Sequence, residues 1–172
     1  KDYVTVNFNQ LADIVDAVGG VTLTLTAAEV NSANQNMAES FPSDPRLSGS
    51  GEMVLTGPQA VSYARIRNID SDNARADRQQ QVLKAIFAKI QTMPKSDYPS
   101  FIREFLSITE TSLGYGDLLA LSPIMLKSNL TFNQYVVPDE HENPTGGTAS
   151  DGVWYWIYDL NAAGDRIHSI IY

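Results

Sequence analysis

Apolar and polar residues alternate with a period of two in several short segments of the chain, which is typical of β-strands. The alternation predicts strands over residues 3–8, 21–26, 130–137 and 153–158. In the last of these segments, one face carries the aromatic side chains Trp154, Trp156 and Tyr158. A sheet covered by helices on both faces accounts for them. The alternative is that this aromatic face borders a lipid or sugar site.

Elsewhere the apolar residues recur every three or four positions, as on the buried face of a helix. This spacing predicts helices over residues 11–18, 74–92, 99–109, 117–126 and 159–170. Thr26 and Glu29 have the spacing of a capping box and predict the start of a short helix, and the segment 56–58 (Thr-Gly-Pro) predicts another start. Residues 31–51 and 138–152 are rich in residues that favour turns, and we expect loops there.

Strands that alternate with helices predict an α/β fold. We expect a single mixed β-sheet flanked by helices on both faces, which is a three-layer α-β-α arrangement. The length of 172 residues and the apolar fraction of 43% fit one domain, spanning residues 1–172.

Composition excludes several classes of function. The formal charge of -8 and the pI near 4.6 argue against non-specific binding of nucleic acid, which needs a broadly basic face. The sequence has no run of about 20 apolar residues, so it predicts no membrane-spanning segment. The lack of cysteine excludes disulfides, thiolate metal sites and cysteine nucleophiles.

Against this acidic background, four of the seven arginines fall within fourteen residues, at Arg65, Arg67, Arg75 and Arg78. A guanidinium group suits phosphate because its planar fork of donors binds two oxygens at once and stays charged. Arg75 and Arg78 lie in the first turns of a predicted helix, where the helix dipole disfavours positive charge. A bound phosphate would reverse that cost, because dipole, free amides and guanidinium would then all favour the anion.

The same arginines have a structural interpretation. Asp70, Asp72 and Asp77 lie among them, and a network of surface salt bridges would explain the cluster without a ligand. A calcium loop of the EF-hand type is excluded. Its sixth position needs glycine and its twelfth needs glutamate, whereas the corresponding residues here are Arg75 and Gln81.

The segment L-T-G-P-Q-A-V-S-Y-A-R-I-R at residues 55–67, then Asp72, then R-A-D-R-Q at residues 75–79, resembles a family motif. The LytR-CpsA-Psr (LCP) domain has roughly L-x-G-x-x-A-L-x-Y-x-R-x-R, an acidic residue, and R-x-x-R-Q. Upstream, Y-V-T-V-N-F at residues 3–8 and the Gly-Gly turn before Val21 are similar to the same family. The resemblance covers residues 3–92 well and residues 93–172 in outline.

This resemblance implies a membrane-anchored, extracytoplasmic phosphotransferase. Such enzymes transfer a phosphoglycan of the teichoic acid or capsular polysaccharide type from a polyprenyl-pyrophosphate carrier to peptidoglycan, with Mg²⁺. It also implies that an apolar tunnel beneath the sheet holds the lipid. The residues that it implies for the pyrophosphate site are Arg65, Arg67, Arg75, Arg78 and Gln79. Asp72 would orient an arginine or assist the metal or the nucleophile.

The chain departs from the family pattern at its start. A metal-binding aspartate and an S-I-P-R-D-like segment precede, in the family, the part that begins here at Tyr3, and neither is present. Either the metal ligands lie in a missing N-terminal segment upstream of residue 1, together with a transmembrane anchor, or this protein lacks half of the active site. We expect the first arrangement. A non-catalytic module that binds polyprenyl phosphate or cell-wall polymer, with a regulatory or scaffolding role, is the alternative function.

Overall fold

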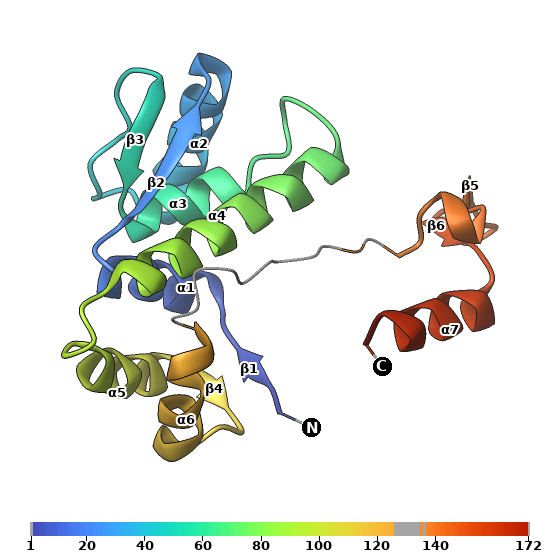
Figure 1. Ribbon diagram of the computed structural model, residues 1–172. Helices are drawn as coiled ribbons and strands as arrows, with labels where there is room; N and C mark the ends of the chain where they lie inside the picture. Colours follow the sequence, from blue (N-terminus) through green and yellow to red (C-terminus); the bar gives the residue numbers. More distant parts are fainter. Residues whose placement is uncertain (1, 126–134, 136, 172) are drawn as a thin grey trace. The chain divides into compact units, whose positions relative to one another are not determined.

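The protein is described by a computed structural model that covers residues 2–125, 135 and 137–171 (Figure 1). It forms two compact units, Lys1–Leu130 and Thr131–Tyr172, and each is described by itself. The organisation of residues 1–172 as one domain stays a prediction. Within the described residues, no helix combines the length and the apolar character needed to cross a bilayer.

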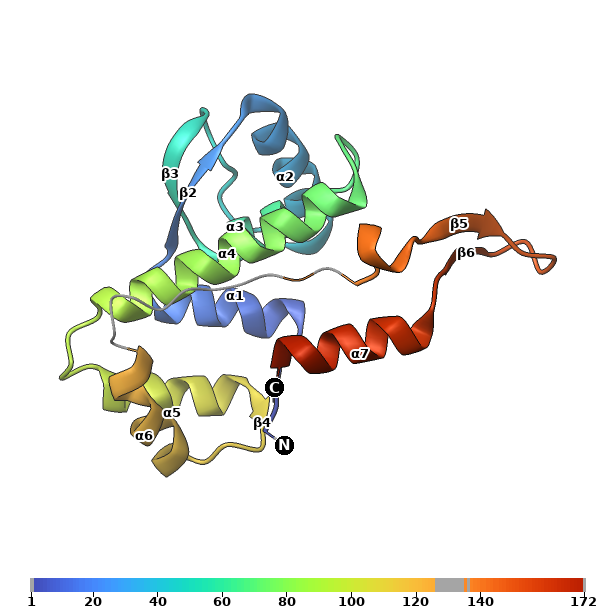
Figure 2. The same cartoon turned by 45° about the vertical axis from the view of Figure 1, so that its right-hand side comes forward.

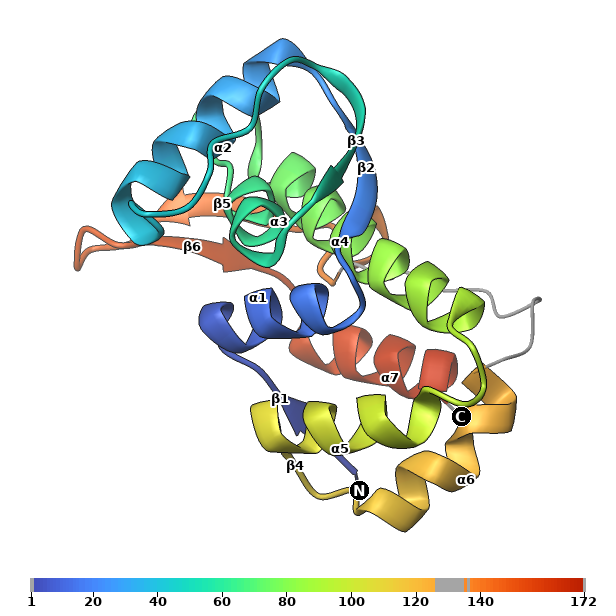
Figure 3. The same cartoon turned by 90° about the vertical axis from the view of Figure 1, so that its left-hand side faces the viewer.

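The first unit contains most of the predicted helices. Its elements are β1 (Val4–Thr5), α1 (Phe8–Ala17), β2 (Val21–Leu25), α2 (Ala27–Ser40), β3 (Gly51–Leu55), α3 (Gly57–Ala64), α4 (Asp72–Thr92), α5 (Tyr98–Ile108), β4 (Glu110–Thr111) and α6 (Tyr115–Met125). In three views, α3 and α4 lie between the part formed by α2, β2 and β3 and the helix α1 (Figure 1, Figure 2 and Figure 3). The helices α5 and α6 lie on the far side of α1.

The predicted α/β class is confirmed, but the strands of the described residues do not form one mixed sheet. They pair as three two-stranded antiparallel ladders, β1 with β4, β2 with β3, and β5 with β6. In β2, Val21, Leu23 and Leu25 are buried while the intervening threonines are exposed, so helices cover one face of that ladder. β1 and β4 have two residues each and no fully buried side chain. Strands this short and exposed offer few backbone hydrogen bonds and little apolar surface to a wider sheet.

The core of this unit lies between the buried face of β2 and the helices α1, α3 and α4. Its largest fully buried side chains include Val15, Leu25, Leu55, Tyr63, Ile66 and Val82. The helix α3 is buried along nearly its whole length and packs on α1, α2 and α4. It therefore fixes where its C-terminal residue, Arg65, can lie.

Two boundaries differ from the sequence-based expectation, the start of α1 and the end of α2. Asn7 ends the predicted strand 3–8: its side chain accepts a hydrogen bond of 2.9 Å from the Gln10 amide, and α1 begins at Phe8. The capping box of Thr26 and Glu29 is present, with 2.9 Å between the Thr26 amide and the Glu29 carboxylate. The helix that it starts continues to Ser40, so the loop predicted over residues 31–51 is wrong for its first half.

The cause of that error is the polar composition of α2. Its buried residues, Val30, Ala33 and Met37, have helical spacing, but Asn and Ser occupy most positions between them. These residues favour caps and turns when nothing is packed against them. Tertiary packing on α3 overrides that preference.

The second unit consists of η1 (Glu140–Glu142), β5 (Thr145–Thr148), β6 (Trp154–Ile157) and α7 (Leu160–Ile171). The loop predicted over residues 138–152 therefore contains a 3₁₀ turn and a strand. Arg166 of α7 donates to the carboxylate of Glu142 at 2.9 and 3.0 Å and to Asp139. The predicted strand 130–137 lies mostly outside the described residues.

The aromatic residues of β6 are not covered in the way that the sequence suggests. Trp154 and Trp156 contact each other edge to face, with ring centroids 4.9 Å apart. Every residue of β6 is exposed in the structure. The sequence predicts helices that cover both faces of this strand. Among the described residues of its own unit, no helix buries either face.

Candidate functional site

Four of the predicted site residues meet at one pocket of about 430 Å³. Arg65 is the C-terminal cap of α3, Arg67 follows it in the connection to α4, and Arg75 and Gln79 lie one turn apart on α4. The Ser71 hydroxyl caps α4 by accepting a hydrogen bond of 3.3 Å from the Ala74 amide. The residues that line the pocket are Phe8, Asn36, Arg65, Arg67, Asn68, Arg75 and Gln79.

Arg65 is held in place from two sides. Its guanidinium lies over the ring of Phe8, 4.9 Å from the ring centroid. It also donates a hydrogen bond to the hydroxyl of Ser40, the last residue of α2. An aromatic face attracts a cation and leaves the edge of the guanidinium available to a ligand. The start of α1 and the end of α2 thus fix the direction in which Arg65 can act.

The two asparagines of the pocket are fixed by the helices behind it. Asn36 donates a hydrogen bond of 3.0 Å to the carbonyl of Ser62. Asn68 accepts from the Ser32 hydroxyl and donates to Gln35 at 3.0 Å. The sequence pattern points to neither of these asparagines nor to Phe8. Asn36 lies in a segment predicted to be a loop, and Phe8 lies in a segment predicted to be a strand.

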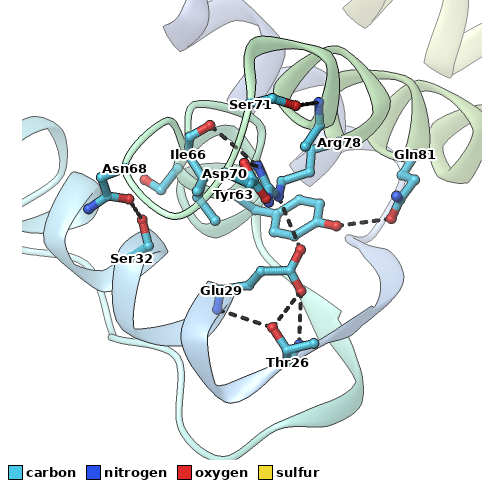
Figure 4. A network of polar contacts seen from close by, with 12 residues as sticks. Thr26, Glu29, Ser32, Tyr63, Ile66, Asn68, Asp70, Ser71, Arg78 and Gln81 are labelled. Carbon is cyan, nitrogen blue, oxygen red and sulfur yellow. Dashed lines mark hydrogen bonds and ion pairs between the residues drawn. The ribbon is translucent and has the colours of Figure 1, made fainter.

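Arg78 does not line the pocket. It is buried, with 4% of its surface exposed, and its side chain is paired with acidic residues (Figure 4). Its Nε donates to Glu29 at 3.0 Å, and its two terminal nitrogens donate to the carboxylate of Asp70. The carbonyl of Ile66 accepts a further bond of 3.4 Å. The predicted pairing of an arginine with Asp70 is therefore present, but Arg78 is buried in this pair, not exposed at the surface as expected.

The charged groups of this network shift the pKa values of their neighbours. Burial opposes the charged form of Arg78, but hydrogen bonds to Asp70 and Glu29 outweigh burial and raise the pKa of Arg78. Burial also opposes the charged form of Glu29, and bonds from Thr26 and Arg78 outweigh it and lower the pKa of Glu29. Tyr63 donates to Gln81 at 2.9 Å, and burial together with the nearby Glu29 charge raises the pKa of Tyr63 to about 12.

The pocket itself is cationic. Three arginines line it, and none of its described lining residues is acidic. Asp72 begins α4, and its side chain is outside what the structure describes. Within residues 2–125, 135 and 137–171, no three acidic or histidine side chains are grouped so that they could hold a metal ion. The described residues thus offer no magnesium site, and the magnesium ion stays a prediction.

The same unit contains an apolar cavity of about 410 Å³. It is lined mainly by apolar side chains, among them Leu11 and Ile14 of α1, Leu83, Ile86, Phe87 and Ile90 of α4, and Phe101, Ile102 and Phe105 of α5. Arg75, Gln79, Leu83 and Phe87 follow one another at intervals of four, so they share one face of α4. That face changes from the cationic Arg75 through the polar Gln79 to the apolar Leu83 within about two turns.

The fold and the site define an α/β protein whose arginine pocket and apolar cavity are built on the same two helices. The model of the LytR_cpsA_psr family matches residues 1–168, and the chain belongs to this family.

Among its curated relatives is the polyisoprenyl-teichoic acid–peptidoglycan teichoic acid transferase TagU of Bacillus subtilis (strain 168). That protein is 30% identical over 176 residues, which cover 95% of this chain and 48% of TagU. TagU of Bacillus cereus (strain AH820) is 32% identical, over 98% of this chain and 51% of its own. The chain thus spans about half the length of the curated relatives that it matches.

Solved structures share the fold. Protein gbs0355 from Streptococcus agalactiae superposes with a TM-score of 0.73 at 24% identity, over 98% of this chain and 55% of its own. TagT from B. subtilis superposes with a TM-score of 0.65 at 21% identity, over 99% of this chain and 59% of its own.

Proposed function

We propose that this chain acts in a cell-wall glycopolymer phosphotransferase. The enzyme would transfer a phosphoglycan of the teichoic acid or capsular polysaccharide type from a polyprenyl-pyrophosphate carrier to peptidoglycan. The observation that carries the proposal is the juxtaposition on α1 and α4 of a cationic pocket and an apolar cavity. A lipid pyrophosphate has a matching anionic head and apolar tail.

The head of such a carrier suits the polar pocket. A pyrophosphate has several negative charges, and Arg65, Arg67 and Arg75 bring three guanidinium groups to one space. Gln79 and Asn36 add amide groups that hydrogen-bond to phosphate or sugar oxygens. Phosphoryl transfer depends mainly on positioning and on stabilising charge as it develops. Three arginines around one pocket meet both needs.

The tail suits the apolar cavity. Gln79 and Leu83 are one turn apart on α4, about 6 Å along the helix axis. A molecule bound along that face would therefore pass from polar to apolar surroundings directly after its head group. Each methylene group that leaves water for such a cavity contributes about 0.8 kcal/mol. The cavity thus favours lipid-linked phosphates over soluble ones.

The relatives support the same substrate class. The name TagU describes a transferase that acts on polyisoprenyl-linked teichoic acid and peptidoglycan. One solved structure with this fold is TagT bound to LIIa-WTA. We extend the substrate class to this chain as a proposal and place its action at the extracytoplasmic face of the membrane, where carrier and peptidoglycan meet. The membrane anchor and the magnesium ion are also part of the proposal.

Binding of two probes tests the pocket and the cavity separately. Calorimetry with inorganic pyrophosphate and with farnesyl pyrophosphate should show tighter binding of the lipid form. Arg75→Ala should weaken both by about 10- to 100-fold, because a charge-assisted contact is worth about 1.5–3 kcal/mol. Leu83→Asp should weaken only the lipid form, because it places a charge against the apolar chain.

Matched controls lie on neighbouring helices. Arg103→Ala removes an arginine that does not line the pocket, and Leu119→Asp changes an exposed leucine that does not line the cavity. Both should bind like the wild type. Equal affinity of wild type and Arg75→Ala for pyrophosphate would reject the pocket. In a transfer assay with lipid-linked glycopolymer and peptidoglycan, tight binding without turnover would instead favour the non-catalytic binding module.

A further inference from the structure

Arg78 belongs to the same sequence motif as Arg75, yet the two side chains have different surroundings. We propose that Arg78 is a positioning residue that orders the connection between α3 and α4, and that it does not bind the phosphate itself. The inference rests on the proposed function, because the connection supplies Arg67 and Asn68 to the proposed pyrophosphate pocket.

The hydrogen bonds of Arg78 leave little for a ligand. A guanidinium has five N–H donors. Four of them are directed at Glu29, Ile66 and the two oxygens of Asp70. The side chain is 5% exposed. An anion in the pocket would have to displace a carboxylate from a buried guanidinium, which is costly.

The local charge also has the wrong sign for an anion. The Arg78 guanidinium carries one positive charge, whereas Glu29 and Asp70 carry two negative charges at hydrogen-bond distance. The hydroxyl of Tyr63, which donates a hydrogen bond to Gln81, is neutral at pH 7 and adds no positive charge. Around Arg78, an added phosphate would meet net repulsion. Around Arg65 and Arg67 it would meet cations.

The acceptors of Arg78 show what it holds. Ile66 and Asp70 lie near the two ends of the connection, and Arg67 and Asn68 lie between them. Glu29 belongs to the first turn of α2, whose later turns provide Asn36 to the pocket. Through these contacts, Arg78 joins α2, the connection and α4 (Figure 4). Removing them would free Arg67 from its place at the pocket.

The two roles have opposite consequences when the acidic partners are neutralised. If Arg78 bound the anion, Asp70→Asn and Glu29→Gln would release its charge, and pyrophosphate would bind more tightly. If Arg78 positions the connection, these variants loosen the connection and pyrophosphate binds more weakly. We expect a loss of roughly 10-fold, in line with the cost of misplacing a contacting group. Arg78→Lys, which keeps the charge but not the fork, should show a similar loss.

The experiment measures pyrophosphate affinity by calorimetry for the wild type, Asp70→Asn, Glu29→Gln and Arg78→Lys, at a temperature where circular dichroism shows each variant folded. Arg78→Ala is avoided because it leaves two buried carboxylates unpaired. Asp77→Asn is the control, since it removes the same charge from an exposed position on α4. Tighter binding by Asp70→Asn would overturn the proposal. So would a lowered melting temperature with unchanged affinity.

Hydrogen–deuterium exchange of the free protein gives a readout that does not depend on the ligand. Asp70→Asn and Arg78→Lys should speed exchange of the amides of residues 66–71, whereas Asp77→Asn should not. Unchanged exchange in Asp70→Asn would refute the positioning role even if pyrophosphate binds. If the wild type binds no pyrophosphate but exchange is still faster in Asp70→Asn and Arg78→Lys than in the wild type, the ordering role of Arg78 is upheld. Only the proposed function is then rejected.

Discussion

The backbone of Gly57 lies against Ala12 so closely that a Cβ atom on residue 57 would stand 2.1 Å from the Ala12 carbonyl oxygen. This contact brings the start of α3 onto α1. It is reinforced by a hydrogen bond of 2.7 Å from the Gly57 amide to the carboxylate of Asp16. Because Arg65 is the cap that follows α3 and α1 begins at Phe8, the contact sets the distance between two elements of the pocket.

We therefore expect Gly57→Ala to destabilise the protein. The new methyl group meets backbone atoms that cannot rotate away, and overpacking of this kind costs about 1–3 kcal/mol. The melting temperature should fall by roughly 2–4 °C for each kcal/mol. Gly116→Ala in α6, where no atom lies within 4 Å of the added Cβ, is the control and should be close to neutral. Equal melting temperatures for the two variants would contradict the close approach.

Phe8→Leu should weaken pyrophosphate binding by roughly 2- to 5-fold, because it removes the ring that holds Arg65 and a cation–π contact at an exposed site is worth about 0.5–1 kcal/mol. Tyr115→Leu is the matched control. It removes the ring beneath Arg103, at 5.2 Å, from a pair that does not line the pocket. Calorimetry should find Tyr115→Leu unchanged; equal losses in both variants would argue against a specific role for Phe8.

The loss of folding stability at acidic pH should depend on Glu29. Its pKa is lowered in the folded protein, so its carboxylate stabilises the fold at pH values above its unfolded pKa of about 4.3. That contribution is lost as the pH falls through the lower, folded pKa. In urea titrations, the free-energy difference between wild type and Glu29→Gln should shrink steadily below pH 4.3. Glu39→Gln, at an exposed position on the same helix, is the control for the loss of a surface carboxylate.

Tyr63 should control the alkaline limb. Its folded pKa of about 12 lies above the unfolded value near 10, so neutral Tyr63 stabilises the fold below pH 10, and that contribution is lost as the pH rises through 12. Near pH 7, Tyr63→Phe should cost about 1 kcal/mol through the lost bond to Gln81. The deficit should narrow above pH 10. Tyr3→Phe, at an exposed position, is the control for the loss of a surface hydroxyl.

The long helix and the arginine pocket could be predicted because periodicity relates neighbours one turn apart. Four positions before the buried Val82 is Arg78, and four before the cavity residue Leu83 is Gln79. The helical periodicity of the apolar residues thus predicts that Arg78 or Gln79 lies near the buried face of the helix. It cannot predict that the acceptor of Arg78 is Glu29, 49 residues away in sequence. Such pairings depend on tertiary packing.

Other features had no periodic signal. The helix α2 is polar at most positions, so its sequence predicts a loop. Nevertheless its middle supplies Asn36 to the pocket, and its last residue, Ser40, accepts a hydrogen bond from Arg65. The strands were recognised by alternation, but alternation does not identify a partner. For that reason, the sequence predicts one sheet where the described residues form three ladders.

The polar-to-apolar face of α4 also sets a length. Residues 75 to 90 span roughly four turns, about 22 Å along the helix axis, from the first arginine of the pocket side to the last isoleucine of the cavity. Under the proposed function, a carrier bound along this face could be enclosed over no more than that span. A longer lipid chain would continue beyond the helix. The protein would then hold the reactive end of the carrier while the far end of the lipid lies outside the protein.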